Sequence, residues 1–364
     1  MNTILMTTAV VTGICVLFAI LLTIADKYIA DYGEVTMIIN DEKEYTVDGG
    51  SSLLDTLRSE KVFIPSACGG KGSCGYCKVK VLEGGGPVLA TEKPWLSKEE
   101  IDDNVRLSCQ CKVKENIKIQ IPEELFNVKE YKVKVVSIEP MTDTIKKFRF
   151  ELPEGEKISF KPGQYIQIKA PAYEGNDEEV YRAYSIASSI LDENHLEVMI
   201  GYTKGIATTY MHKFVKEGDY IDLNGPYGDF YYHDGEDEVV LVAAGTGFAP
   251  IRSILFHMKD NDIKRKTRFY FGAKTPEDLF LLDELKMFEE TLYDFKFMPT
   301  LSRVTEEMNW TGDTGRVNNS IDTYLEEGND YSAYLCGSPV MIESIVKSLE
   351  DKKVPDEKIY FDEF

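Results

Sequence analysis

Cysteines in the first third of the chain have a spacing that suits an iron–sulfur cluster. Cys68, Cys74 and Cys77 lie in one glycine-rich loop, CGGKGSCGYC, and Cys109 and Cys111 follow after a long gap. Three thiolates in a tight loop can hold one side of a cluster, and a distant fourth thiolate closes the site. The glycines let the backbone fold closely around an inorganic group and point N–H donors at its sulfides. We therefore predict a [2Fe–2S] cluster bound by this loop and one later cysteine.

Zinc and disulfide bonds are the alternatives for such a loop. A structural zinc site usually has two C-x2-C pairs or histidine partners, whereas this loop has one such pair and no histidine nearby. The chain has seven cysteines, and assigning four of them to a cluster argues against a disulfide framework and fits a reducing compartment. Spacing alone leaves the fourth ligand open, because Cys109 and Cys111 would point to the same face of a strand.

A second group of residues, Arg182-Ala183-Tyr184-Ser185, has side chains that suit a flavin. An arginine can pair with a phosphate through two hydrogen bonds, and a tyrosine can pack against the flavin ring. A serine hydroxyl can hydrogen-bond a ring nitrogen and tune it. Alone, the tetrapeptide is weak support, because it is more often an ordinary strand.

The segment GIATT could hold the phosphates of such a cofactor. Gly205, Thr208 and Thr209 stand where a helix, TTYMHKFV, is predicted to begin. Free N–H groups and hydroxyls at a helix start bind anions, here a pyrophosphate. The alternative is that Thr208 only caps the helix.

The segment AGTGFAP (244–250) follows a continuous apolar strand and opens another predicted helix. Its glycines let a pyrophosphate approach the turn, although the segment is not a full G-x-G-x-x-G and is weak by itself. The candidate nucleotide-binding residues are Gly245, Thr246, Gly247, Ala249 and Pro250.

A further candidate group, Cys336-Gly337-Ser338-Pro339, ends a later predicted strand. This is the carboxyl edge, where parallel sheets bind their ligands, so the four residues are assigned to the same nucleotide site. The alternative for Cys336 is a buried core thiol.

The elements that must position these residues predict a multidomain chain. Residues 33–128 are predicted as an α+β domain, with short strands around one helix and the cysteine loop. Residues 129–232 carry short alternating strands separated by Gly and Pro, which predict an antiparallel β-barrel. Residues 233–364 alternate strands with helices, which predicts an α/β domain built on a parallel nucleotide-binding sheet.

The N-terminal segment, 1–27, is predicted to be a transmembrane helix that anchors the chain. Residues 2–25 carry no charged side chain, and this stretch is long enough to cross a hydrocarbon core of roughly 30 Å. A cleaved signal peptide is the alternative, but the segment lacks a basic start and a clear cleavage site. Lys27 follows the uncharged stretch and no Lys or Arg precedes it, which predicts that the body of the chain lies on the cytoplasmic side of the membrane.

Composition excludes one class of function. The 364 residues carry 41 basic and 62 acidic side chains, for a net charge of −21. Nucleic-acid binding requires a basic face, so we expect no nucleic-acid partner.

Taken in order, these motifs resemble the ferredoxin–NADP reductase family, preceded by a domain that resembles the β-grasp of plant-type ferredoxins. With the membrane helix in front, the whole chain resembles the F subunits of Na+-translocating NADH:quinone oxidoreductases. Specific matches include RLSCQ around Cys109, RAYS at 182–185, NWTGDTG at 309–315 and the ending FDEF. The cysteine loop has one more residue in its first gap than the plant-type ferredoxin pattern.

The resemblance implies a role for each motif. It implies FAD contacts at 182–185, flavin-phosphate contacts at Gly205, Thr208 and Thr209, and Cys109 as the fourth cluster ligand. It also implies an NADH site along 245–250.

At the reacting end of the site, the resemblance implies Cys336 beside the nicotinamide and Phe364 over the flavin ring. Ser185, Cys336 and Phe364 are then the catalytic residues. The alternative for Phe364 is a terminal residue tucked into the core.

The implied activity is hydride transfer from NADH to FAD, followed by single-electron transfer through the [2Fe–2S] cluster towards quinone. The implied partners are other membrane subunits of a respiratory complex in the inner (cytoplasmic) membrane, with quinone reached indirectly. Two alternatives stand beside this: a reductase component of an oxygenase, and a tethered electron carrier without turnover. The sequence identifies neither the final acceptor nor whether Na+ or H+ is moved.

Two features depart from the family pattern. The loop between KAPAYEG and RAYS is short where the family has a longer insertion, which leaves the docking of neighbouring subunits open. Arg303 follows Leu301-Ser302, where NADP-using relatives place a phosphate-binding arginine, so the choice between NADH and NADPH also stays open.

Overall fold

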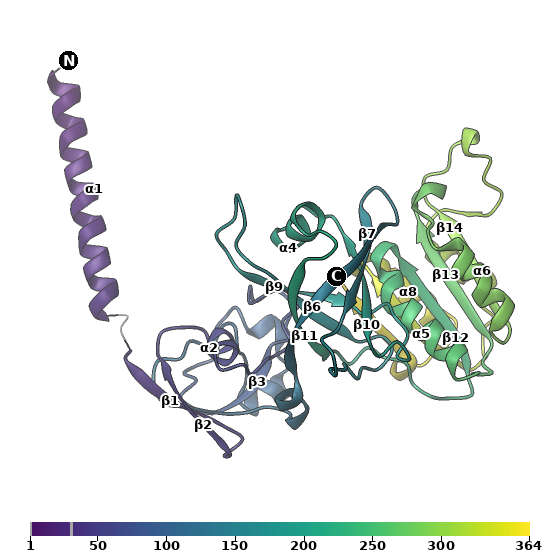
Figure 1. The fold of residues 1–364 in the computed structure, drawn as a ribbon, viewed down its shortest axis with the longest axis horizontal. Helices are drawn as coiled ribbons and strands as arrows, with labels where there is room; N and C mark the ends of the chain where they lie inside the picture. The colour runs from purple at the N-terminus through teal and green to yellow at the C-terminus, as the bar shows by residue number, and fades with distance from the viewer. Residues whose placement is uncertain (1, 30–31) are drawn as a thin grey trace. The chain divides into compact units, whose positions relative to one another are not determined.

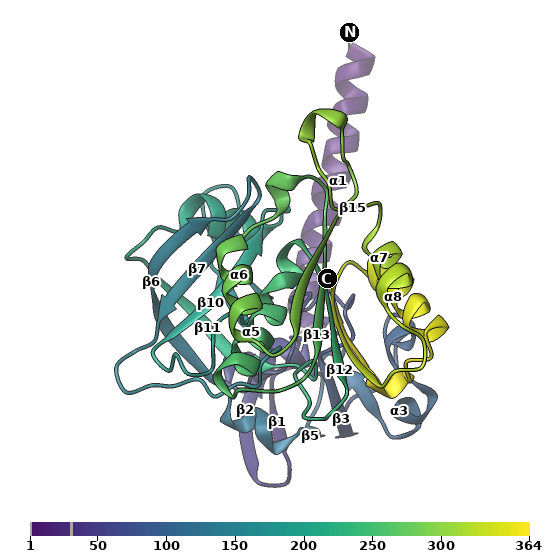
Figure 2. The ribbon, with the colours of Figure 1, turned by 90° about the vertical axis from the view of Figure 1, so that its right-hand side faces the viewer.

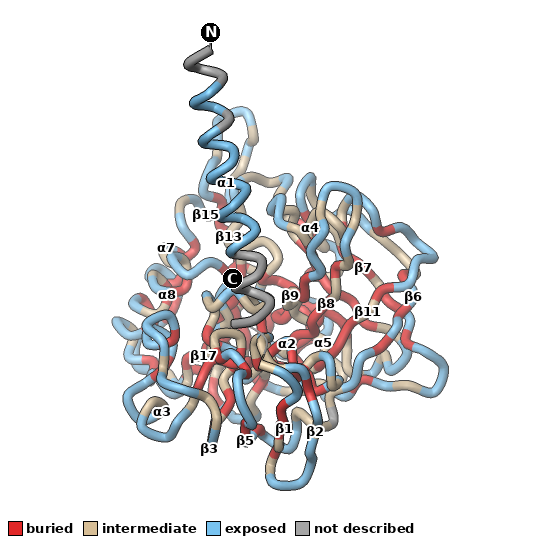
Figure 3. The backbone as a smooth tube through the Cα atoms, turned by 90° about the vertical axis from the view of Figure 1, so that its left-hand side faces the viewer, coloured by how far each residue is buried: buried red, intermediate tan, exposed pale blue. Residues whose placement is uncertain are grey.

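The computed structural model describes the backbone of residues 2–29 and 32–364, and the side chains within it other than those of 2–5, 9, 22–29 and 127. The chain divides into two compact units, Met1–Val128 and Lys129–Phe364 (Figure 1). Figure 3 shows that the buried stretches follow the strands of the sheets.

A single helix, α1 (Asn2–Ile29), covers most of the predicted membrane anchor. The remainder of that prediction, Met1 and the side chains of 2–5, 9 and 22–27, lies outside the described residues. Within the part of the chain that the structure describes, no helix combines the length and the apolar character that a membrane span requires.

The rest of the first unit is a mixed five-stranded sheet in the order β2-β1-β5-β3-β4. Strands β1 and β5 run parallel, and the other neighbours run antiparallel. Helix α2 begins where predicted, because the Ser52 side chain accepts a hydrogen bond from the backbone N–H of Asp55. The elements are β1 (Glu34–Ile39), β2 (Lys43–Asp48), α2 (Leu53–Ser59), β3 (Lys78–Glu83), α3 (Lys98–Asp102), β4 (Val105–Leu107) and β5 (Ile117–Gln120).

The second unit begins with a six-stranded antiparallel sheet in the order β10-β7-β6-β11-β8-β9. A bridge between Ile186 and Val198 links the two ends of this sheet, so it curls towards a closed barrel, as predicted. Two short helices, α4 (Ile206–Thr209) and the π-helix η3 (Tyr210–Phe214), follow β10. The strands are β6 (Lys129–Pro140), β7 (Ile145–Glu151), β8 (Tyr165–Ala170), β9 (Val180–Ser185), β10 (His195–Gly201) and β11 (Tyr220–Tyr227).

The predicted parallel sheet follows, in the order β15-β14-β13-β12-β16-β17. Helices α5 and α6 cover one face and α7 and α8 the other (Figure 2). The elements are β12 (Glu238–Ala244), α5 (Phe248–Asp260), β13 (Thr267–Ala273), α6 (Leu282–Thr291), β14 (Phe295–Leu301), β15 (Asp313–Thr314), α7 (Val317–Tyr324), β16 (Tyr331–Gly337), α8 (Pro339–Asp351) and β17 (Ile359–Glu363).

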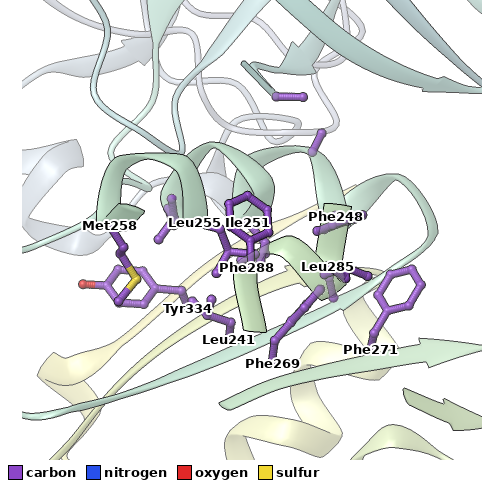
Figure 4. Packing of buried hydrophobic residues seen from close by; sticks show 14 of the residues in the cluster. Leu241, Phe248, Ile251, Leu255, Met258, Phe269, Phe271, Leu285, Phe288 and Tyr334 are labelled. Carbon is purple, nitrogen blue, oxygen red and sulfur yellow. The ribbon is translucent and has the colours of Figure 1, made fainter. Parts of the chain in front are cut away.

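Aromatic packing holds the α5–α6 layer on the sheet. Phe248 at the start of α5 stacks on Phe269 of β13, with ring centroids 5.2 Å apart (Figure 4). Burying such large rings contributes much of the stability of a core. This packing fixes the start of α5 beside the end of β12, where the predicted nucleotide-binding turn lies.

Three local predictions need correction. The segment PEDLFLLDELKMFEE (276–290) suits one helix by its apolar pattern but forms two elements, a 3-10 turn at Pro276–Asp278 and then α6, because Leu281 adopts a left-handed φ of 55°. The helix predicted for TTYMHKFV instead divides into α4 and η3. Helix α7 and strand β17 are additional elements that local patterns did not predict.

Candidate functional site

The four predicted cluster ligands form two pairs of contacting thiols. Cys68 interacts with Cys74, and Cys77 interacts with Cys109, each through a side-chain hydrogen bond. This contact with Cys74 lowers the pKa of the Cys68 thiol to about 4, and the contact with Cys77 lowers the pKa of Cys109 to about 7. The thiolate is the form that binds a metal, so all four sulfurs would lose their protons on coordination.

The pairing fits a two-iron centre. Among the described residues, no group of three or more His, Cys, Asp or Glu side chains could hold one metal ion. A structural zinc site needs four ligands around one centre. A [2Fe–2S] cluster instead takes two ligands on each of its two irons, which is the arrangement that two cysteine pairs supply.

Glycines shape the loop as predicted. Gly70 and Gly72 have φ values of 88° and 72°, which favour glycine. A Cβ atom on Gly72 would lie 2.6 Å from the side-chain nitrogen of Gln110, so a side chain here would displace the Gln110 amide. The same Gln110 nitrogen donates to the Cys109 sulfur at 3.6 Å.

The structure separates Cys109 from Cys111, because neither residue lies in a strand. Strand β4 ends at Leu107, and the carbonyl of Leu107 accepts hydrogen bonds from the N–H groups of Gln110 and Cys111. This turn aims the two side chains differently. The Cys111 thiol is buried in the core and donates to the carbonyl oxygen of Gly85 at 3.7 Å, and burial raises its pKa.

Ser108, beside Cys109, is a residue that sequence reasoning did not single out. Its side chain is fully buried, and its hydroxyl lies beside the Cys77 thiol. Cys109 and burial raise the pKa of Cys77, and the Ser108 hydroxyl acts in the opposite direction.

The predicted flavin residues lie on β9, which pairs with β8. Arg182 and Tyr184 point to one face of this strand, and Ala183 and Ser185 to the other. The Tyr184 hydroxyl is buried without a hydrogen-bond partner among the described residues, and burial raises its pKa. A buried polar group without a partner is unusual, so this hydroxyl fits a site completed by a bound polar group.

The predicted phosphate segment folds as a tight turn. Thr208 Oγ1 accepts a hydrogen bond from the N–H of Thr203 and donates to the carbonyl of Gly205. The helix cap is Gly205, so the alternative that Thr208 caps the helix is wrong. Thr209 is half-buried at the end of α4.

A cavity of about 550 Å³ lies at the carboxyl ends of the parallel strands and also contacts the barrel. This volume is within the range of small-molecule sites. Four predicted residues line it: Gly245, Thr246, Ser338 and Phe364. The segments that begin α5, α7 and α8 all contribute lining residues, so the positive ends of three helix dipoles surround this space.

Other predicted residues lie behind the wall of the cavity. A Cβ atom on Gly247 would lie 2.2 Å from the carbonyl oxygen of Cys336, so this glycine permits close packing of α5 on β16. Cys336 is fully buried, and burial raises the pKa of its thiol well above the usual value. Among the residues predicted for the nucleotide site, the others that do not line the cavity are Ala249, Pro250, Gly337 and Pro339.

Phe364 lies at the edge of the cavity, and the alternative that it is tucked into the core is wrong. Its side chain is 60% exposed, while its backbone N–H donates to the carbonyl of Gly337 at 3.2 Å. Strand β17 brings it there by pairing with β16.

Sequence reasoning missed several lining residues. Lys274 and Arg316 bring two cations to the cavity, and Thr144 and Tyr202 line it from the barrel. Lys274 could have been found, because it follows the predicted strand TRFYFG at the carboxyl edge. Arg303 has an exposed side chain outside the lining, and its neighbour Ser302 lines the cavity instead.

The fold and the site define a class of protein, the flavin-dependent reductases that carry a ferredoxin-like cluster domain. Family models match in the same order: a 2Fe-2S iron-sulfur cluster binding domain at residues 37–114, an oxidoreductase FAD-binding domain at 132–232 and an oxidoreductase NAD-binding domain at 241–347.

Relatives narrow this class to one family. The chain is 34% identical to the F subunit of the Na(+)-translocating NADH-quinone reductase of Neisseria gonorrhoeae, over 97% of both chains. The corresponding F subunits of Histophilus somni and Serratia proteamaculans are 34% and 32% identical, each over 98% of both chains. The chain therefore belongs to the family of Na(+)-translocating NADH-quinone reductase F subunits.

Solved structures share the fold. The ferredoxin reductase in carbazole 1,9a-dioxygenase aligns with a TM-score of 0.70 at 24% identity, covering 91% of this chain and 98% of its own. The FAD/NAD-binding domain of a nitric oxide dioxygenase from Vibrio cholerae aligns with a TM-score of 0.58 at 21% identity, covering 64% of this chain and 98% of its own.

Proposed function

We propose that this chain is the NADH-oxidising subunit through which electrons enter a sodium-translocating NADH:quinone reductase. The observation that carries the proposal is similarity to such subunits over nearly the full length, with the three cofactor-binding domain families in the same order. When bound, FAD takes a hydride from NADH and the [2Fe–2S] cluster carries single electrons onward, so the cofactors supply the redox chemistry.

The cluster-binding residues in this proposal are Cys68, Cys74, Cys77 and Cys109. Their arrangement in two contacting pairs supports the assignment, because each pair can serve one iron. Cys111 is buried in the core, which supports leaving it out of the set of cluster ligands.

The flavin is held by 182–185 on β9, and its phosphates by Gly205, Thr208 and Thr209. The unpartnered Tyr184 hydroxyl supports this assignment. Ser185 is proposed to hydrogen-bond the flavin ring, as a serine hydroxyl can.

The nucleotide occupies the cavity in this proposal. Gly245 and Thr246 border its phosphates, with the α5 start contributing its positive end. Lys274 and Arg316 supply positive charge for the same phosphates. Phe364, at the edge of this cavity, is proposed to cover the flavin ring.

The other predicted nucleotide-site residues shape this space from behind. Gly247, Ala249 and Pro250 set the path of α5 away from the cavity, and 337–339 form the turn into α8. Cys336 keeps an uncharged thiol behind the nicotinamide end. NADH is the proposed nucleotide, which is supported by Arg303 lying outside the lining.

A membrane anchor at the N-terminus and further membrane subunits as partners are part of this proposal. Its support is the absence of charge from residues 2–25 and the exposure of the described apolar side chains of α1 between Met6 and Leu21. Exposed apolar surface of this kind is typical of a segment that meets a membrane or a partner. Lys27 supports a cytoplasmic position for the two units.

The test separates hydride transfer from electron delivery. A Cys74→Ala variant should retain FAD, and NADH should reduce its flavin in stopped-flow at the wild-type rate. The same variant should reduce a soluble dye but not quinone in reconstituted membranes, with and without Na+. If this cluster-free variant reduced quinone at the wild-type rate, electrons would not pass through the cluster.

A further inference from the structure

Ser108 is held rigidly next to the cluster ligands. Its backbone N–H donates to the carbonyl of Cys77 at 2.8 Å, and its own carbonyl accepts from the N–H of Leu54 at 3.1 Å. The N–H and the carbonyl of Ser108 are therefore both held by hydrogen bonds, and the N–H is bonded directly to Cys77, a proposed cluster ligand. The side chain has no exposed surface.

The Ser108 hydroxyl has no satisfactory partner in the protein alone. Within the described part of the chain, its oxygen is buried and lacks a partner that meets hydrogen-bond geometry. The residues bonded to Ser108 through the backbone are also buried, since Leu54 has no exposed surface and Cys77 is 1% exposed. A buried hydroxyl normally finds an acceptor, so the orphaned oxygen indicates a partner that the bound site supplies.

Sulfur is the acceptor that this position offers. The hydroxyl lies beside the Cys77 thiol, which becomes a thiolate when it binds metal. A hydrogen bond to an ionised acceptor is stronger than one to a neutral acceptor, and an apolar environment strengthens it further. Hydrogen bonds to the ligand sulfurs are one of the factors that set the reduction potential of iron–sulfur clusters.

We propose that Ser108 is a positioning residue that sets the reduction potential of the cluster, by donating its hydroxyl hydrogen to the Cys77 sulfur. The inference rests on the proposed function only in requiring a bound [2Fe–2S] cluster. The hydrogen bond stabilises the more negative, reduced form, so it raises the potential.

The first test is an EPR-monitored redox titration of the full-length protein. At the wild-type midpoint potential, Ser108→Ala should show a roughly tenfold lower ratio of reduced to oxidised cluster, which corresponds to about 59 mV for one electron. Ser108→Thr keeps the hydroxyl and should keep the wild-type potential. Thr56→Val is the matched control, because Thr56 is also buried but its hydroxyl donates to the carbonyl of Ser52.

The second test is resonance Raman spectroscopy in H2O and D2O. The iron–sulfur stretching bands of the wild type and Ser108→Thr should shift in D2O, and the shift should be smaller in Ser108→Ala. Equal potentials and equal isotope shifts in Ser108→Ala and the wild type would overturn the proposal.

If Ser108→Ala does not assemble a cluster, Ser108→Cys replaces it. A thiol is a weaker donor than a hydroxyl, so this variant should have a lowered potential, and a wild-type value would overturn the proposal. Neither measurement uses NADH turnover or quinone. If the proposed quinone reductase function were wrong, the redox titration and the Raman spectra would therefore still test the role of Ser108.

Discussion

The position of a single residue decides which cysteine can be the fourth cluster ligand, as two neighbouring cysteines show. Cys109 and Cys111 are equivalent by sequence spacing, yet one contacts Cys77 and the other is buried in the core. The carbonyl of Leu107 makes the difference, because it holds a turn between them.

This contrast predicts different results for two substitutions. Cys109→Ala should abolish the visible absorption of the cluster, because one iron loses a ligand. Cys111→Ala should keep that absorption and lower the free energy of unfolding by about 1 kcal/mol, since it only removes buried sulfur.

Absorbance spectra and urea titrations of the purified variants measure both effects. Cys336→Ala, which removes a fully buried thiol of the other unit, is the matched control. Loss of the cluster in Cys111→Ala and its retention in Cys109→Ala would reverse the ligand assignment.

At the scale of elements, a buried ionic network joins the barrel to the parallel-sheet layer. Arg252 of α5 donates to the carbonyl of Ala187 at 2.7 Å and to Glu197 of β10 at 2.6 Å. The other edge of its guanidinium forms two hydrogen bonds with Glu284 of α6. The cavity depends on both layers, so this network holds together the elements that line it.

Breaking the network should be costly. Arg252→Met would remove the guanidinium that pairs with both Glu197 and Glu284, leaving only Arg149 and Lys147 beside Glu197. The free energy of unfolding should fall by about 3–5 kcal/mol in urea titrations. Arg268→Met is the control, because Arg268 pairs with the largely exposed Asp294 and its loss should cost about 0–1 kcal/mol. Equal losses in the two variants would contradict a special role for the buried network.

The same network predicts a pH dependence. Burial acts to raise the pKa of Glu197, but Arg252 and Lys147 outweigh it, and the pKa is lowered from 4.5. A carboxyl whose pKa is lower in the folded state stabilises the fold above its unfolded pKa and loses this contribution as the pH falls through the folded value.

Stability should therefore decline below about pH 4.5, as Glu197 becomes protonated. In Glu197→Gln, the free energy of unfolding should be lower at pH 7 and should change less between pH 6 and pH 4. Urea titrations at a series of pH values measure this, and parallel profiles for the two proteins would contradict the prediction.

For the whole molecule, the two compact units divide the proposed work between cluster and nucleotide chemistry. Residues 129–364 contain the cavity and the proposed flavin strand, and residues 34–128 contain the four cysteines. No described residue of helix α1 lines the cavity.

Deletion of residues 1–29 should therefore leave hydride chemistry intact. The truncated chain should reduce a soluble dye with NADH at the wild-type rate, and NADH should still reduce its cluster. It should no longer sediment with membranes or reduce membrane quinone, because the anchor is missing. A truncated chain that sediments with membranes like the wild type would contradict the role proposed for the N-terminal helix.

Much of the fold could be predicted from the sequence, because the patterns that form it are local. Alternation of apolar residues predicted the barrel strands, and continuous apolar runs predicted the parallel strands around Leu241 and Leu335. The Ser52 cap lies three residues from its partner, so it was also visible. Helix α7 and strand β17 have weaker patterns, and β17 forms by pairing with β16 along its length.

The sequence by itself determined the order of cofactor motifs and the spacing of the cluster cysteines, since both are properties of short segments. Only the tertiary structure decided which distant side chains meet. Lys274 and Arg316 meet at one cavity because parallel strand order brings their loops to the same edge of the sheet, and Tyr202 lines this cavity from the barrel. Likewise, Ser108 faces Cys77 because the N–H of Ser108 bonds to the carbonyl of Cys77. Contacts of this kind depend on long-range pairing, which local propensity does not specify.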